Sequence, residues 1–492
     1  MKLRIKKLRF LTGKPVCMIH EKTAKEMSLH VNNRVSISKN KKTIISVIDT
    51  VSGFLKSNEI AVSETIMKKL NLRPESFVNV ELAERPLSID LIKKKLRGEV
   101  LTKEEINEII FNIANNSLTE VEVAFFVSAI YMNEMSMDET KNLINAMVKS
   151  GNQIKLNGKV VDKHSIGGVA GNRTTPIIVS ICAATGLIMP KTSSRAITSA
   201  AGTADVLETV AKVEFSIKEI KKIIKKTNAC FVWGGTLGLA PVDDKIIKIE
   251  RIVNIDSTAQ LLGSILSKKI SVGSKYVLID IPYGKSAKVD KAKAKKLKTK
   301  FLRLGKQFGL KIKVVLTNGS EPIGNGIGPV LEIKDVLAVL TRNNPPKDLE
   351  QKSLMLSAQL LEISGKVKKG KGKKIAKEIL DSGKAFKKFL QIIKSQEGGI
   401  DRLDKLNPKF SYDIKSWRKF KIKHIDNKLI NRLARHLGCP EDKSAGIYIH
   451  KKKGDKVNKG EVILTIYALS EDKLNHAKKF YKQNKKEMIE VR

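Results

Sequence analysis

The pattern that most restricts the fold lies between residues 157 and 340, where short apolar runs alternate with helical stretches and glycine-rich turns. Alternating β and α signals of this kind indicate parallel strands joined by crossover helices. We therefore expect a mostly parallel, doubly wound α/β domain over residues 157–345. Ligands bind such sheets beyond the carboxyl ends of the strands, so the loops after these runs are the first candidate sites.

The rest of the chain divides where the hydrophobic period changes. Residues 1–84 alternate apolar and polar residues between turn-forming breaks, which predicts a small β-rich, barrel-like domain. Residues 85–156 change to helical spacing and predict a small helical domain. Residues 346–492 predict a C-terminal α+β domain. Its GDKVNKG turn is similar to a biotinyl or lipoyl hairpin, but no carrier lysine lies between small or Met residues, so we interpret it as structural.

Three capping boxes mark the expected helix starts in the helical domain. Each places a serine or threonine three residues before a glutamate, so that the two side chains satisfy each other's backbone N–H groups. The pairs are Thr102 with Glu105, Ser117 with Glu120, and Ser136 with Glu139.

Composition excludes several classes of protein. Hydrophobic residues make up 41% of the 492, enough for real cores, so global disorder is excluded. The longest apolar stretch, residues 176–190, is interrupted and falls short of the roughly 18 to 20 residues that span a bilayer. The N-terminal residues carry no signal-peptide pattern, and Cys17, Cys182, Cys230 and Cys439 form no disulfide or zinc spacing. We expect a cytoplasmic protein with reduced, mostly buried cysteines.

The large positive charge raises a nucleic-acid alternative. Lys plus Arg exceed Asp plus Glu by 93 to 50, a formal charge of +43. Clustered cations bind phosphates by releasing counterions, yet aromatic residues are only 5% and no RNA- or DNA-binding motif is present. The lysine runs at 285–300 and 367–374 are explained more simply as solvated helix faces and turns.

Residues 163–175, KHSIGGVAGNRTT, carry the strongest local pattern. They follow a strand-like run and precede an apolar helix. Glycines let backbone N–H groups converge, the helix N-terminus adds partial positive charge, and Lys, Ser and Thr add donors, all of which suit a phosphate. The loop is not a Walker A motif, and from spacing alone an ordinary strand-to-helix turn remains the alternative.

A second loop of donors covers residues 191–205, KTSSRAITSAAGTAD. Several hydroxyls and one arginine lie among small residues that let a ligand approach the backbone. Two such loops suggest two anionic groups. A serine- and threonine-rich surface loop is the alternative, although it would need neither the arginine nor the glycine.

A third cluster combines Asp256 with Ser264 and Lys268. On a helix Ser264 and Lys268 share one face. A carboxylic acid at 256 could protonate a leaving group if burial raised its pKa, but Asp256 could equally cap the following helix.

Five ordered segments, KHSIGGVAGNRTTP, SSRAITSAAGTAD, WGGTLGLAPVDD, IDSTAQLLGSILSKK and IDIPYGKSAK, together resemble the thymidine phosphorylase family, and most closely its archaeal branch that acts on nucleotides. The resemblance covers nearly the whole chain. It implies phosphorolysis, in which a nucleoside 5′-monophosphate (AMP, and with it CMP and UMP) and inorganic phosphate give a free base and ribose 1,5-bisphosphate. It also implies no cofactor, dimers formed through the helical domain, and larger homo-oligomers assembled with the N-terminal domain. No motif requires a metal, because His164, His436 and His450 are scattered without metal-ligand spacing.

The resemblance assigns roles to the matching residues. Asp256 matches the residue that protonates the departing base, while Lys163 and Arg195 match groups that position the phosphates. His164 lies either near the ribose or acts as a structural hydrogen-bond partner. The matching nucleotide contacts are Gly168, Ser194, Arg195, Ala196, Ile197, Thr198, Ser199, Thr203, Ser264 and Lys288. The matching inorganic-phosphate and base-facing positions are Lys163, Ser165, Thr174, Ser193 and Thr203, and Ser264 with Lys268.

Three alternatives remain. A pyrimidine nucleoside phosphorylase would accept thymidine or uridine, but the arginine expected before the base-facing serine fits Arg251 only with a one-residue gap. An anthranilate phosphoribosyltransferase-like enzyme would need Mg²⁺ and a pyrophosphate-binding motif that the sequence lacks. The third alternative is an RNA-binding protein, which would show a steep salt dependence on a nucleic-acid column.

Overall fold

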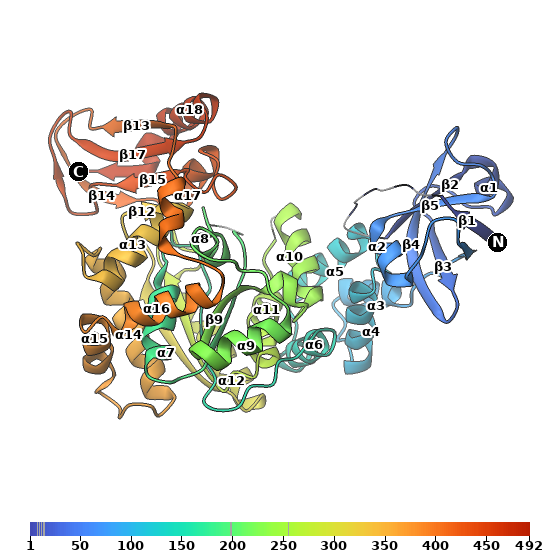
Figure 1. The fold of residues 1–492 in the computed structure, drawn as a ribbon, viewed down its shortest axis with the longest axis horizontal. Coiled ribbons are helices and arrows are strands. Elements are labelled where there is room, and N and C mark those ends of the chain that lie inside the picture. The colour runs from blue at the N-terminus through green and yellow to red at the C-terminus, as the bar shows by residue number, and fades with distance from the viewer. Residues whose placement is uncertain (7, 9, 11, 13–14, 197–198, 254) are drawn as a thin grey trace. The chain divides into compact units, whose positions relative to one another are not determined.

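The structure is a computed structural model that describes residues 1–492 except 7, 9, 11, 13–14, 197–198 and 254 (Figure 1). It divides into two compact units. The first comprises Met1–Ser150 with Ala240–Ser264, and the second comprises Gly151–Leu239 with Ile265–Arg492. Within the described residues, no helix is long and apolar enough to cross a membrane.

The first unit begins with a closed β-barrel, as the alternating pattern predicts (blue in Figure 1). Its strands follow each other around the barrel in the order β1-β5-β2-β4-β3-β6. Every second residue points inward, so leucine, isoleucine and valine side chains fill the interior. The elements are β1 (Lys2–Ile5), β2 (Val16–His20), α1 (Glu21–Glu26), β3 (Arg34–Lys39), β4 (Lys42–Val51), β5 (Glu59–Val62), α2 (Glu64–Leu70) and β6 (Phe77–Leu82).

The same unit continues as a helical domain. Four of its helices follow one another in the sequence: α3 (Ser88–Leu96), α4 (Lys103–Ala114), α5 (Glu120–Met132) and α6 (Met137–Lys149). The predicted capping boxes at Thr102 and Ser136 are confirmed. The third prediction is wrong by two residues, because Thr119 and Glu122 form the box that begins α5.

The helical domain also takes in a later segment that the sequence analysis placed in the α/β domain. Helix α10 (Pro241–Val253) and the first part of α11 (Thr258–Ser271) belong to this unit. Val242, Ile246 and Ile249 of α10 share the buried core of helices α3 to α6. The boundary prediction failed because periodicity shows which face of a helix is apolar without showing which partner covers it.

The second unit contains the α/β domain, and all its strand ladders in the described residues are parallel, as predicted. One sheet has the order β11-β10-β7, and β8 pairs with β9. A parallel bridge between Val160 and Ile188, the residues directly before β7 and β8, joins the three-stranded sheet to the β8–β9 pair. The strands are β7 (Val161–Ser165), β8 (Met189–Ser193), β9 (Ala229–Trp233), β10 (Tyr276–Tyr283) and β11 (Lys311–Asn318).

Helices cover these strands, and both α12 and α14 pack against β10 and β11. Helix α12 turns Leu297, Phe301 and Leu304 inward and leaves many of its lysines exposed, which confirms the prediction of a solvated lysine face. The helices of this domain are α7 (Thr174–Ala184), α8 (Thr203–Leu207), α9 (Ile217–Thr227), α12 (Lys291–Gln307), α13 (Pro329–Thr341), α14 (Lys347–Ile363), α15 (Gly372–Asp381) and α16 (Lys384–Ser395).

The predicted start of the C-terminal domain at residue 346 is too early. Helices α14 and α16 pack against α7, and their leucine and isoleucine side chains belong to the α/β core. The C-terminal domain itself follows as an α+β fold (orange to red in Figure 1), with a sheet of order β12-β15-β17-β13 and a second of order β16-β14-β18. Its elements are β12 (Gly326–Ile327), β13 (Phe410–Lys415), β14 (Phe420–Ile425), α17 (Asn427–His436), β15 (Gly446–Ile449), β16 (Lys456–Val457), β17 (Val462–Ala468), α18 (Glu471–Met488) and β18 (Ile489–Val491).

The four cysteines are free and buried, as expected.

Candidate active site

The two donor loops follow neighbouring parallel strands. The first loop lies between β7 and α7, and the second lies between β8 and α8. Because β7 and β8 run parallel and are joined beside their first residues, the two loops leave the same edge of the sheet. The sequence-based prediction that the two loops lie at the carboxyl ends of strands is therefore confirmed.

Lys163 lies in β7 and is buried beneath the first loop. Its Nζ donates to the Thr174 hydroxyl at 2.9 Å, at the first residue of α7. Burial lowers the pKa of Lys163 to about 8, against the opposing effect of the Asp280 carboxylate. The structure thus brings together two of the predicted phosphate contacts, a lysine and a helix N-terminal threonine.

His164 is half-buried in the same strand. Burial and then the neighbouring charges of Lys269, Lys191 and Lys163 hold its pKa well below the usual value. The imidazole is therefore uncharged at neutral pH and does not add a further cation. The next residue, Ser165, accepts a long hydrogen bond of 3.4 Å from the side chain of Asn172.

Gly168 brings the first loop against the Lys288 segment. Its φ is +87°, a conformation that favours glycine. A Cβ atom at this position would lie 2.7 Å from the backbone nitrogen of Lys288. The glycine therefore permits a close approach between two predicted nucleotide contacts that are far apart in the sequence.

Replacing Gly168 by alanine is expected to raise the KM for the nucleotide about tenfold or more, because a small displacement of binding groups is costly. Gly370→Ala is the matched control. Gly370 has a similar φ of +84° and open space around the added methyl group. The control should lose about 1 kcal/mol of stability from the backbone strain alone and keep its KM. Equal KM values in the two variants would contradict the role given to Gly168. Steady-state kinetics with thermal unfolding of both variants checks this.

The second loop is closed by Asp205. One oxygen of this buried carboxylate, Oδ2, accepts from the backbone N–H groups of Ala196 and Gly202, at 2.7 and 2.8 Å. The hydroxyl of Ser199 donates to the Ala201 carbonyl. Ser194 is exposed, and Ser193 donates weakly to the Val232 carbonyl. The predicted contacts Ile197 and Thr198 lie outside the described residues.

Arg195, predicted to position the phosphates, is paired with carboxylates of its own chain. Its guanidinium pairs with both oxygens of Glu208, at 2.8 Å each, and also with Asp205 and Glu214. It stacks over the ring of Trp233. Three carboxylates surround this group, so an added anion would meet strong competition. These contacts favour an Arg195 side chain that holds the shape of the loop.

Arg173, which the sequence analysis did not single out, ties the two loops together. Its Nη1 donates to the Thr203 hydroxyl at 2.7 Å, and Nη2 donates to the Ala201 carbonyl at 2.8 Å. Its Nε donates to Glu332 on α13 at 2.7 Å. One rigid fork thus connects the last residue before α7 to the second loop.

A buried array of charges lies under the same strands. Asp162 of β7 accepts from Lys269 at 2.5 Å and pairs with Lys191 at 3.3 Å. It also accepts from the backbone N–H of Lys163. Burial lowers the pKa of Lys269 to about 7, although the Asp162 carboxylate acts in the opposite direction. The sequence alone does not distinguish Asp162 from any other aspartate in a strand. Its two lysine partners in the structure identify it as part of a buried charge array.

The remaining predicted residues lie on or beside α11. Asp256 and Ser264 belong to the first unit, whereas Lys268 belongs to the second. The alternative in which Asp256 caps the helix is not supported, because the hydroxyl of Ser257 accepts from the backbone N–H of Gln260. Asp256 is exposed within its unit, so the burial that the sequence-based hypothesis required is absent there.

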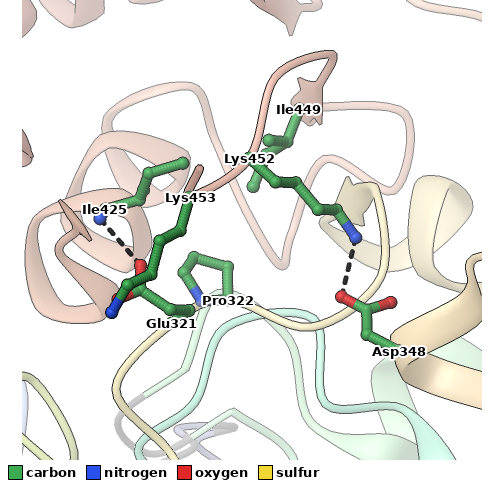
Figure 2. Close-up of a pocket in the computed structure, with 7 residues that line it drawn as sticks. All are labelled: Glu321, Pro322, Asp348, Ile425, Ile449, Lys452 and Lys453. Carbon is green, nitrogen blue, oxygen red and sulfur yellow. Dashed lines mark hydrogen bonds and ion pairs between the residues drawn. The ribbon is translucent and has the colours of Figure 1, made fainter. Parts of the chain in front are cut away.

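A separate pocket lies between the α/β and C-terminal parts of the second unit (Figure 2). Its charged side chains neutralise one another. Lys452 pairs with Asp348 at 2.7 Å, and Lys453 pairs with Glu321 at 3.3 Å. Figure 2 shows Glu321 also accepting from the backbone of Ile425. None of the predicted site residues lines this pocket, so the donor loops remain the candidate site.

Comparison with known proteins agrees with this architecture. Residues 89–151 match the helical bundle domain of a glycosyl transferase family, and residues 157–386 match its α/β domain. Residues 421–486 match the C-terminal domain of pyrimidine nucleoside phosphorylases. The domains therefore define a transferase of the nucleoside phosphorylase type.

Full-length relatives narrow this class. The chain is 42% identical to the AMP phosphorylases of Thermococcus kodakarensis and Pyrococcus furiosus over 97% of its length and 95% of theirs. It is 40% identical to the AMP phosphorylase of Methanocaldococcus jannaschii over 94% of its length and 92% of that protein. The chain belongs to the AMP phosphorylase family.

A solved structure shares part of the fold. Anthranilate phosphoribosyltransferase from Thermus thermophilus superimposes with a TM-score of 0.53 and 17% identity, covering 63% of this chain and all of that one. This likeness supports the helical and α/β architecture and says nothing of the reaction.

Proposed function

We propose that this protein catalyses the phosphorolysis of AMP, giving adenine and ribose 1,5-bisphosphate, with CMP and UMP as further substrates. The observation that carries the proposal is the pair of donor loops at the ends of β7 and β8, tied by Arg173, in a chain of the AMP phosphorylase family. Together the two loops supply donors for two anionic groups, the nucleotide 5′-phosphate and inorganic phosphate.

The roles follow the chemistry of each group. Lys163 and Thr174, with Ser165, Ser193 and Thr203, hold inorganic phosphate. Gly168, Lys288 and the 194–199 loop hold the nucleotide. A phosphate oxygen forms a bond to C1′ of the ribose while the bond from C1′ to the base nitrogen breaks. Asp256, which takes up its proton when the bound nucleotide covers it, gives that proton to the departing base. Ser264 and Lys268 face the base.

The proposal needs no metal and no organic cofactor, because inorganic phosphate is the co-substrate. It places the enzyme in the cytoplasm, where nucleotides and phosphate are available, as a homo-oligomer. The uncharged His164 adds a hydrogen bond near the ribose without competing for the phosphates.

The test is the release of free base from AMP, CMP, UMP, adenosine and thymidine, each with and without phosphate. We expect phosphate-dependent release from the nucleotides and at least tenfold less from the nucleosides, since the nucleosides lack the 5′-phosphate that these donors bind. Turnover of thymidine alone would identify a pyrimidine nucleoside phosphorylase. Absence of turnover with every substrate would contradict the enzyme proposal and direct attention to an RNA partner.

A further inference from the structure

A buried carboxylate holds the hydroxyl of Ser264. Ser264 lies on α11, and its Oγ donates to Oδ2 of Asp243 at 2.9 Å. Asp243 is fully buried in the first turn of α10, where the helix N-terminus favours a negative charge. Its second oxygen, Oδ1, accepts from Nε2 of Gln260 at 2.9 Å. All three residues lie within the first unit.

The direction of the Ser264 bond follows from the chemistry of the two groups. A carboxylate offers only acceptors, whereas a hydroxyl offers one proton and two lone pairs. Ser264 gives its single proton to Asp243, so its oxygen has only lone pairs left for a ligand. Gln260 donates to the other carboxylate oxygen, so Oδ2 is left to accept from Ser264.

We propose that Asp243 is a positioning residue that fixes Ser264 as a hydrogen-bond acceptor, so that the site selects bases presenting an N–H group to Ser264. This inference rests on the proposed function, in which Ser264 faces the base. In AMP the N–H donor on the six-membered ring is the amino group of adenine. A base without any N–H group there leaves the fixed acceptor unpaired, which lowers kcat/KM about 10- to 100-fold.

The test compares AMP with purine riboside 5′-monophosphate, which lacks the amino group. The measured quantity is the ratio of the two kcat/KM values. The intrinsic leaving ability of each base is the same for every variant, so a change in the ratio between variants reports the enzyme's own contact. We expect a preference for AMP of about tenfold or more in the wild type.

Five variants separate the contributions. Ser264→Ala is expected to bring the ratio close to the intrinsic value. Asp243→Asn and Asp243→Leu are each expected to lower the ratio at least fivefold, because the Ser264 hydroxyl then no longer donates its proton to a carboxylate. In the Ser264→Ala background, Asp243→Asn should change the ratio no further. Gln260→Met is the matched control, because it removes the other bond to the same carboxylate and should keep the ratio.

Each outcome decides the inference. A ratio that stays at the wild-type value in both Asp243 variants, or in Ser264→Ala, overturns it while leaving AMP phosphorolysis intact. Failure of the wild type to release any base removes the proposed function itself. Thermal unfolding shows whether each variant folds. Gln260→Met should be destabilised by an amount similar to that of the Asp243 variants, while its ratio of kcat/KM values stays unchanged.

Discussion

Replacing Asp256 by asparagine is expected to lower kcat about 10²- to 10⁴-fold, the usual contribution of a general acid. The change keeps the size of the side chain and removes the proton that the leaving base must receive. Asp256 is exposed within its unit, and Ser257 already caps α11. The cap at Ser257 is unchanged in this variant, so it should fold and retain its KM values for AMP and phosphate. Steady-state kinetics at saturating phosphate measures this.

A substrate with a charged leaving group sharpens the Asp256 experiment. The base of 7-methylguanosine 5′-monophosphate already carries a positive charge and departs without protonation. The loss of activity in Asp256→Asn should therefore shrink to less than about tenfold with this substrate. Asp138→Asn is the control, because Asp138 is another exposed aspartate of the first unit with no assigned role. An equal loss with both substrates would indicate a structural role for Asp256.

Local patterns were sufficient to predict the elements and the loops. Alternation in residues 1–84 predicted the barrel, and the β and α alternation predicted the parallel strands. The donor loops could be predicted because each is one continuous stretch that follows its strand directly. For the same reason Lys163 and Thr174, only 11 residues apart, were both singled out before their contact was known.

Contacts between distant segments could not be predicted in this way. Arg173 and Glu332 are 159 residues apart, and Lys269 and Asp162 are 107 apart. A single sequence gives the charge of each residue without giving its partner. Arg195 shows the same limit, because the sequence gives no sign of its three carboxylate partners. The predicted domain boundaries differ from those in the structure for the same reason, because apolar helix faces pack against partners that lie elsewhere in the chain.

The buried array around Asp162 carries the largest expected effect on stability. Asp162→Asn is expected to lower the free energy of unfolding by about 3–5 kcal/mol, because Lys191 and Lys269 would lose the carboxylate that balances their charge. Asp381→Asn is the matched control. Asp381 also pairs with two cations, Lys377 and Arg342, but it lies at the surface. The control should cost at most about 1 kcal/mol. Chemical denaturation of both variants at pH 6 gives the comparison.

The pH dependence distinguishes loss of charge balance from loss of packing. The pKa of Lys269 is about 7 in the folded protein and that of a free lysine is 10.5. Between these values the unfolded chain binds more protons, so the stability cost of burying Lys269 falls as pH rises. The attraction between Lys269 and Asp162 is lost over the same interval, because the folded lysine becomes neutral. The destabilisation by Asp162→Asn should therefore be largest below pH 7 and narrow towards pH 9. A destabilisation that is constant across this range would show that Asp162 acts through packing rather than through its charge.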